Sequence, residues 1–510
     1  MNRFFCKSAL LLLPAAFPVS AWACAQQTVG VVADSEPKSP ADANHASTLV
    51  VGHVFAFPVA TKSVQAQKLV ETALDQYENV LLENSVESAR KAAEKDPQFA
   101  LAYALWSFAA RRIQPNPEAA RKAESLAATA PADERLLVNF LTSVQKDDML
   151  PAIIAMNDLL ARFPNDRHAL YLTSEWLYFQ QDYDRSVKMM EQIIKLDPNF
   201  APAYNMLGYA KVETGDPDPA KAIAYLKKYA ELQPGQPNAE DSLGEVSRYA
   251  GDDRGSIEHY KAALRFSPAF ITAQTGLGDT YSLMHDFSSA AAEYDKALAM
   301  STNNRDRLHV EFQKALMKFW AGRPAEGLQA LADAEQKAHA AHEPYSEFEI
   351  QQASALLALT LKQRIAKLQE MERIYSHPVK GMGESDRNPS LASIWRDQVR
   401  VQVEQNHVDA TAETIRKLEQ LAAQSRDLIV ENCYESARGY VFFAQKDYAS
   451  AQDELSADPH SPIAINWLVA AREKLGDQKG AESARLRLKY LRAPTAEWYL
   501  ATQANTASVH

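Results

Sequence analysis

The sequence is poor in cysteine, glycine and clustered basic residues, and each shortage excludes a class of protein. Three cysteines among 510 residues cannot supply the disulfide framework of a small secreted domain. Only 17 glycines, beside many Ala, Leu, Glu, Lys and Gln residues, favour helices joined by short turns over sheets. A formal net charge of −11 without basic runs argues against a nucleic-acid partner, because neutralising phosphates requires clustered Lys and Arg.

Motifs for catalysis and cofactor binding are also missing. The sequence has no Gly-rich phosphate loop ending in Lys-Ser/Thr, no Gly-x-Ser-x-Gly elbow and no paired-Cys zinc pattern. His339 and His342 could meet one metal, with Glu347 or Glu349 as a distant third ligand. Spacing alone does not make a metal site, so the favoured interpretation is two polar residues at a helix end. Cys433 lies in a helical stretch and is predicted to be buried and inert. We therefore expect a protein that is not an enzyme and has neither a cofactor nor a metal.

The first 25 residues have the pattern of a secretory signal. Arg3 and Lys7 form a basic region, and the apolar stretch Ala9 to Val19 that follows is too short to span a bilayer. No later apolar run reaches membrane-spanning length. The sequence therefore predicts an exported protein, periplasmic or secreted, without a transmembrane segment.

Two cleavage positions for this signal stay open. Both Ala23 and Ala25 end a small-x-small motif. A lipid anchor on Cys24 is the less favoured alternative, because Trp22 is bulky for a lipoprotein signal and Ala21 lies where Leu is usual.

A regular spacing of proline runs through the first half of the chain. The intervals between successive prolines of this set are 34, 33, 34, 36 and 34 residues, at Pro97, Pro131, Pro164, Pro198, Pro234 and Pro268. Each proline follows one amphipathic helical segment and precedes another. A period of this length indicates a repeated helical hairpin.

The repeat from Ala201 to Pro234 shows how one hairpin is built. Tyr204 and Leu207-Gly208 lie on one face of the first helix. Gly215-Asp216 breaks that helix, and Asp218-Pro219 supplies an N-cap with proline at the first position of the second helix. Small residues such as glycine let the two helices approach closely.

These residues resemble the tetratricopeptide repeat family, whose pattern runs from an aromatic residue through Leu-Gly and a Gly-Asp turn to a terminal proline. The same pattern recurs at 237–268 and 271–302, and 167–198 keeps it with Thr173-Ser174 in place of Leu-Gly. The resemblance implies an all-α protein, an α-solenoid in which antiparallel helical hairpins form a right-handed superhelix.

The repeat pattern divides the rest of the chain into predicted segments. The stretch 48–59 is apolar and β-branched and is expected to pack over the first helices, and 379–389 carries two glycines, a proline and scattered charges. The segments are a signal peptide (1–25), a flexible N-terminal segment with a short apolar arm (26–65), regular tetratricopeptide repeats (66–304), degenerate helical repeats (305–378), an exposed loop (379–389), C-terminal tetratricopeptide-like repeats (390–494) and a capping segment with a polar tail (495–510).

What the resemblance implies for function is capture of an extended peptide or a partner helix in a concave groove lined by the first helices. By register, the side chains that point away from the second helix are the candidate groove residues. They are Tyr171, Glu175, Tyr178, Asn205, Tyr209, Asp241, Glu245, Arg248, Thr275 and Asp279. The tyrosines suit a binding surface, and the four carboxylates favour a partner carrying Lys or Arg. A solvated helix face would show the same charges.

The sequence therefore predicts a non-catalytic protein- or peptide-binding scaffold of the bacterial cell envelope. Two alternatives stay open. An enzyme with its site in 318–389 would show a polar cavity with convergent titratable groups there, whereas a scaffold would show an open groove. A self-assembling structural protein would show a mass that depends on concentration.

Overall fold

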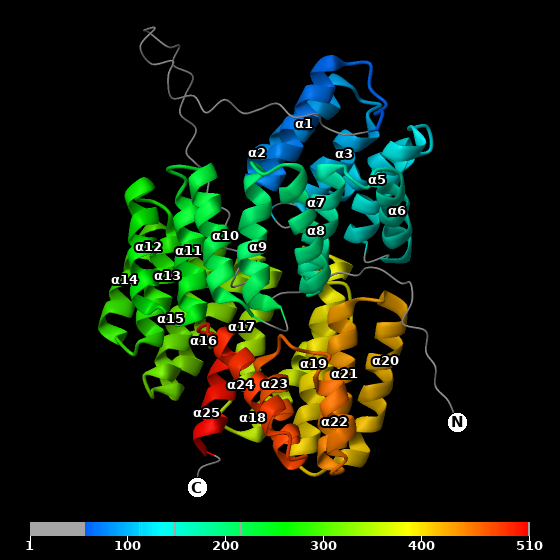
Figure 1. The fold of residues 1–510 in the computed structure, drawn as a ribbon. Coiled ribbons are helices and arrows are strands. Elements are labelled where there is room, and N and C mark those ends of the chain that lie inside the picture. The colour runs from blue at the N-terminus through cyan, green and yellow to red at the C-terminus, as the bar shows by residue number, and fades with distance from the viewer. Residues whose placement is uncertain (1–56, 112, 114, 147–148, 215–216, 508–510) are drawn as a thin grey trace.

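The computed structural model describes residues 57–507 except 112, 114, 147–148 and 215–216. The predicted signal peptide, Cys24 and most of the N-terminal segment lie outside these residues. Throughout the described part the regular structure is helical, and successive helices pair as antiparallel hairpins (Figure 1). The prediction of an all-α solenoid is confirmed. None of the described helices is long and apolar enough to cross a membrane.

The helices follow one another with short connections. The first group is α1 (Val64–Glu78), α2 (Leu82–Lys95), α3 (Ala100–Ala110), α4 (Pro117–Ala127), α5 (Ala132–Gln145), α6 (Met149–Arg162), α7 (Arg167–Phe179) and α8 (Tyr183–Leu196). The second is α9 (Ala201–Glu213), α10 (Pro219–Leu232), α11 (Pro237–Ala250), α12 (Asp253–Phe266), α13 (Ile271–Leu283), α14 (Phe287–Met300), α15 (Asn304–Trp320) and α16 (Pro324–Ala341). The third is α17 (Pro344–Leu356), α18 (Leu361–Tyr375), α19 (Glu384–Glu404), the 3-10 helix η3 (Val408–Thr411), α20 (Ala412–Ser425), α21 (Leu428–Ala444), α22 (Tyr448–Leu455), α23 (Pro462–Lys474), α24 (Gln478–Tyr490) and α25 (Ala496–Ala507).

Four successive second helices, α8, α10, α12 and α14, begin at the same kind of cap. An aspartate side chain accepts a hydrogen bond from a backbone N–H three residues further on, and it does so at Asp182, Asp218, Asp252 and Asp286. Each carboxylate satisfies an amide that would otherwise lack a partner at the helix start. The turn between the two helices is therefore set by the sequence, repeat after repeat.

Glycines of the first helices let large side chains of the second helices lie against the backbone. A Cβ atom at Gly208 would lie 2.4 Å from Leu226 Cγ, and one at Gly278 would lie 2.5 Å from the ring of Tyr294. Leu226 and Tyr294 are completely buried. The Leu-Gly pair of the sequence pattern thus marks the closest contact within a hairpin.

The predicted loop at 379–389 is wrong in its second half. Helix α19 already begins at Glu384, and Pro389 is its sixth residue and is buried. The proline removes one helical hydrogen bond near the helix start, and the acidic Glu384 and Asp386 favour the first turn through the helix dipole. A proline that the sequence suggests as a helix breaker is therefore accommodated inside the helix.

The end of the predicted apolar arm packs against the first repeats. Phe57 is 5% exposed, and its ring centroid lies 5.3 Å from that of Phe163. The backbone N–H of Ala60 donates to the carboxylate of Glu134, which also accepts from the N–H of Leu101 at 3.2 Å. The described end of the segment therefore covers the connection between repeats.

The C-terminal helices return to the middle of the chain, so the solenoid closes on itself. Its largest hydrophobic cluster contains residues of α7 to α9 together with residues of α15 to α25. Trp320 of α15 lies 5.3 Å from Trp498 and 4.8 Å from Tyr499, both on α25, between ring centroids. In Figure 1 the red helices α24 and α25 lie beside the green helices α15 to α17. The open groove expected of a scaffold is therefore not what this part of the chain shows.

Candidate functional site

The ten predicted groove residues lie on the first helices α7, α9, α11 and α13, as the register required. The side chains of Asn205 and Tyr209 are half-buried, and those of the other residues in the set are buried. Their contact with a partner remains a prediction. What the structure does show is how they bind one another.

One network of hydrogen bonds joins three successive repeats. Glu245 accepts from Tyr209 Oη at 3.0 Å and from Arg248 Nη2 at 3.1 Å. Arg248 Nη1 donates to Asp279 at 3.2 Å, and Tyr294 Oη donates to the same carboxylate at 2.8 Å. Since these residues come from α9, α11, α13 and α14, the predicted binding residues also fix the repeats relative to one another.

The remaining predicted residues make local contacts of the same kind. Glu175 accepts from Tyr77 Oη at 2.7 Å, which links α7 to α1. Tyr171 Oη donates to the carbonyl of Glu78 at 3.2 Å, and the ring of Tyr178 lies 4.9 Å from that of Tyr183. Asn205 Oδ1 accepts from Ser242 at 3.0 Å, and Thr275 Oγ1 donates to the carbonyl of Ile271 at 2.9 Å.

Asp241 differs from the other carboxylates of this face. It is 4% exposed, and its Oδ1 atom has no hydrogen-bond partner among the described residues. Burial, and then the nearby charge of Glu245, raise the pKa of Asp241 well above its ordinary value. This face of the first helices therefore holds a buried carboxyl group that a nearby cation would help to ionise.

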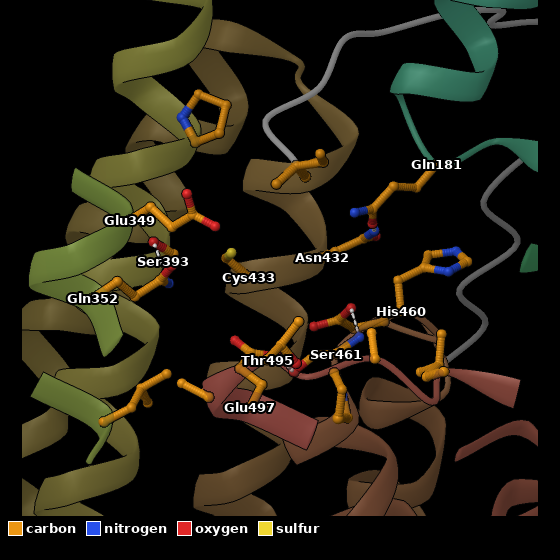
Figure 2. A pocket seen from close by; sticks show the side chains of 18 of the residues that line it. Gln181, Glu349, Gln352, Ser393, Asn432, Cys433, His460, Ser461, Thr495 and Glu497 are labelled. Carbon is orange, nitrogen blue, oxygen red and sulfur yellow. Dashed lines mark hydrogen bonds between the residues drawn. The ribbon is translucent and has the colours of Figure 1, made fainter. Parts of the chain in front are cut away.

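A cavity of about 230 Å³ lies where the returning C-terminal helices meet the middle of the chain. Figure 2 shows Glu349, Gln352 and Ser393 on one side of it. Gln181, Asn432 and His460 lie on the opposite side, Cys433 lies between the two sides, and Ser461, Thr495 and Glu497 lie below. The cavity draws on residues separated by more than half the chain, so no local motif marks it.

Glu349 of α17 is a carboxylate of the cavity wall with a large pKa shift. Among the described residues it makes no hydrogen bond and no ion pair, although its side chain is half-buried. Burial raises the pKa of Glu349 to about 8. The carboxyl group is therefore mainly protonated at neutral pH in the free protein.

A buried ion-pair cluster closes the bottom of the cavity. Arg396 Nη2 donates to Glu497 at 2.8 Å, and Arg396 Nη1 lies 3.8 Å from Asp458. Ser461 Oγ donates to the second oxygen of Glu497 at 3.1 Å. Burial raises the pKa of Glu497 even though Arg396 opposes the shift. This cluster joins α19 and α25 and gives the cavity a charged floor.

A second cluster attaches the C-terminal half to α9. Arg487 Nη2 donates to Glu213 at 3.2 Å and to His460 Nδ1 at 3.0 Å. Burial, and then Arg487, lower the pKa of His460 well below its ordinary value, so the imidazole is neutral. Tyr183 packs edge-on against His460 at 4.6 Å, and its hydroxyl has no partner among the described residues.

Cys433 lines the cavity as a thiol and not as a thiolate. It is 3% exposed, and burial raises the pKa of its thiol far above the usual range. The predicted burial of Cys433 is confirmed. A nucleophilic cysteine needs the opposite shift.

A cluster of metal-ligand type lies elsewhere, between α1 and α7, and sequence reasoning missed it. Ligand atoms of Asp75, Glu78 and His168 lie within 4.8 Å of one another. His168 Nδ1 lies 2.5 Å from Glu78, and Arg167 donates to His168 Nε2 at 3.3 Å. Both ring nitrogens are therefore engaged, and the cationic Arg167 opposes a metal ion there. The ninety-residue separation of Glu78 and His168 left no spacing signal in the sequence.

Comparison with known protein families identifies one of the repeats. The tetratricopeptide repeat family model matches residues 201–236. This match and the succession of capped helical hairpins make the chain a protein of the α-solenoid class. Within that class, it carries a tetratricopeptide repeat at residues 201–236.

Parts of the chain are similar to solved structures. The crystal structure of MamA protein is 23% identical over 33% of this chain and 91% of its own, with a TM-score of 0.29. A tetratricopeptide repeat protein from Parabacteroides merdae ATCC 43184 is 14% identical over 54% and 94%, with a TM-score of 0.35. PilW, a type IV pilus biogenesis factor, is 20% identical over 42% of this chain and 95% of its own, with a TM-score of 0.33. No curated protein sequence matches the chain.

Proposed function

We propose that the protein is a non-catalytic scaffold, exported to the cell envelope, that binds a basic segment of a protein partner on the concave face of its repeats. The tetratricopeptide repeats support the general role in protein interaction. Export rests on the basic and apolar pattern of residues 1–25. The mass of protein isolated from the envelope would test it, because an uncleaved N-terminus contradicts export through this signal.

The proposal of a basic partner rests on an excess of carboxyl groups over positive charges on the concave face. Glu245 and Asp279 share the single guanidinium of Arg248, and Asp241 keeps an oxygen without a partner. A Lys or Arg side chain would supply the missing positive charge. Desolvated charge pairs of this kind contribute to specificity and association rate.

The half-buried Asn205 and Tyr209 are the residues with which to test this site. Tyr171 is unsuitable, because it is 2% exposed and packs on Phe200 at 5.5 Å, so its removal would destabilise the fold. We expect the double variant Asn205→Ala with Tyr209→Phe to weaken binding about five- to tenfold, as loss of central interface contacts does. Binding would be measured by fluorescence anisotropy with an extended labelled Lys-Ala peptide.

The controls are a Glu-Ala peptide of equal length and the variant Lys227→Ala, an exposed position on the second helix α10. The Glu-Ala peptide should not bind, and Lys227→Ala should leave affinity unchanged. Equal binding of the two peptides, or unaltered affinity of the double variant, would contradict the proposed site. Light scattering on the same samples tests self-assembly, which predicts a mass that rises with concentration.

One observation favours the second candidate, an enzyme. The cavity has convergent titratable groups, and its α17 wall with Glu349 falls within 318–389. However, the thiol of Cys433 and the imidazole of His460 are both held in their neutral, buried forms. Nothing in this arrangement activates a nucleophile. We therefore propose a binding role for the cavity as well.

A further inference from the structure

The walls of the central cavity carry more acid than base. Its carboxylates are Glu213, Glu349, Asp458 and Glu497. Arg396 forms ion pairs with both Asp458 and Glu497. Arg487, which does not line the cavity, forms an ion pair with Glu213. His460 adds no charge, because burial and Arg487 lower its pKa. If all four carboxylates ionise, two negative charges therefore lack a counter-charge from these arginines.

The cavity also offers surfaces that attract cations without carrying charge. The rings of Tyr183, Tyr249, Phe312 and Phe348 contribute to its lining. Aromatic faces stabilise ammonium and guanidinium groups, most strongly where water is excluded. Acidic oxygens combined with aromatic walls suit an organic cation better than an anion or a neutral sugar.

A buried hydroxyl gives a second, independent indication of a ligand. Tyr183 lines the cavity and is 2% exposed, yet its Oη atom has no hydrogen-bond partner among the described residues. Buried polar groups are normally paired, and one that lacks a partner costs free energy. A ligand nitrogen or hydroxyl in the cavity would supply a partner for Tyr183.

We propose that the central cavity is a binding site for a small organic cation, an alkylammonium or guanidinium compound whose charged group pairs with Glu349. The apolar body of the ligand would lie against the aromatic rings. The cavity adjoins the surface proposed for the protein partner at Tyr249, whose hydroxyl donates to Glu245 at 2.8 Å. The two proposals are tested with different probes and different variants, so either can fail without the other.

A series of probes that differ only in charge tests the proposal. n-Butylamine, n-butanol and butyrate have similar shapes, and calorimetry with the full chain would measure binding of each. We expect only the amine, and agmatine as its guanidinium counterpart, to bind. Binding at neutral pH should release about one proton, because the protonated Glu349 ionises beside the cation.

Glu349→Gln keeps the shape of the side chain and removes the charge. We expect it to weaken amine binding about tenfold or more and to abolish the proton release. The matched control is Glu347→Gln on the same helix, whose carboxylate bonds His339 at 3.0 Å and does not line the cavity. That variant should bind the amine as the wild type does.

Three results would overturn the proposal. They are equal binding of n-butanol and n-butylamine, unchanged amine affinity in Glu349→Gln, and no amine binding to the wild type. The tripeptide Gly-Lys-Gly is a further probe. If this peptide binds and no free amine does, the cavity is a site for the lysine side chain of a protein partner and not for a small organic cation. Because proton release is measured on the wild type, the test does not depend on how well a variant folds.

Discussion

Two glutamates on α17 differ in their chemistry because of where their side chains lie. Glu347 is hydrogen-bonded to His339 at 3.0 Å at the end of α16. Glu349, two residues later, lines the cavity and has no hydrogen-bond or ion-pair partner in the described part of the chain, and burial raises its pKa to about 8. The sequence offered either one as a distant third ligand beside His339 and His342, which was the disfavoured interpretation, and the structure places Glu347 beside His339 and Glu349 at the cavity. The surroundings of each carboxyl group, and not the residue type, determine its charge.

The raised pKa of Glu349 predicts a stability cost that grows with pH. A carboxyl group with a raised folded-state pKa stabilises the fold below its unfolded pKa, and that contribution is lost as pH rises from about 4.5 to about 8. A pKa shift of this size lowers the free energy of unfolding at high pH by about 4–5 kcal/mol, and by less if water in the cavity reaches the carboxyl group. We therefore expect Glu349→Gln to raise the free energy of unfolding by about 2–4 kcal/mol above pH 8 and by under about 1 kcal/mol at pH 5.

Urea unfolding at a series of pH values would measure this difference. Glu258, which is 66% exposed on α12, provides the control, and Glu258→Gln should change stability by only a few tenths of a kcal/mol at any pH. If the stability that Glu349→Gln gains over the wild type does not increase with pH, the carboxyl group of Glu349 is solvated.

Within each repeat, the close approach of the two helices depends on a glycine and a large buried side chain. Tyr294 of α14 lies over Gly278 of α13, and its hydroxyl donates to Asp279 at 2.8 Å. The tyrosine is held at both ends, so it cannot move away from an added methyl group. Dense packing makes even one extra carbon atom costly at such a place.

We expect Gly278→Ala to destabilise the protein by about 2–3 kcal/mol, although alanine is the better helix former by about 1 kcal/mol. The added Cβ atom would lie 2.5 Å from the Tyr294 ring. Thermal unfolding of Gly278→Ala, Tyr294→Leu and the double variant would measure the coupling. The double variant should be more stable than the sum of the single effects allows, and strict additivity would contradict the contact.

The same elements show how far the fold could be predicted from the sequence. The aspartate caps, the Leu-Gly pairs and the periodic prolines are local signals, and they located the hairpins correctly. Pro389 led to the wrong prediction of a loop, because the effect of a proline on a helix depends on its position within that helix. The cavity gave no signal, since Gln181 and Glu497 become neighbours only when the solenoid closes. The groove residues lie on the first helices, most of them buried, and their contact with a partner stays a prediction.

At the scale of the whole molecule, two arginines of the C-terminal end hold the chain closed. Arg487 donates to the carbonyl of Val212 at 2.6 Å and to Glu213 at 3.2 Å. Arg492 donates to the carbonyl of Arg248 at 3.2 Å and pairs with Asp253. Both contacts reach helices α9 to α12 from residues more than two hundred positions later.

Arg487→Met tests whether this closure stabilises the fold. Glu213 would lose its counter-charge in a place where burial already raises its pKa, and breaking a buried ion pair costs about 3–5 kcal/mol. Adding Glu213→Gln removes the uncompensated charge, so the double variant should regain much of the stability that Arg487→Met loses. Urea unfolding would measure these free energies, and trypsin cleavage at Arg492 would report opening of the connection before α25. A single variant as stable and as resistant to trypsin as the wild type would show that the two halves hold together without Arg487.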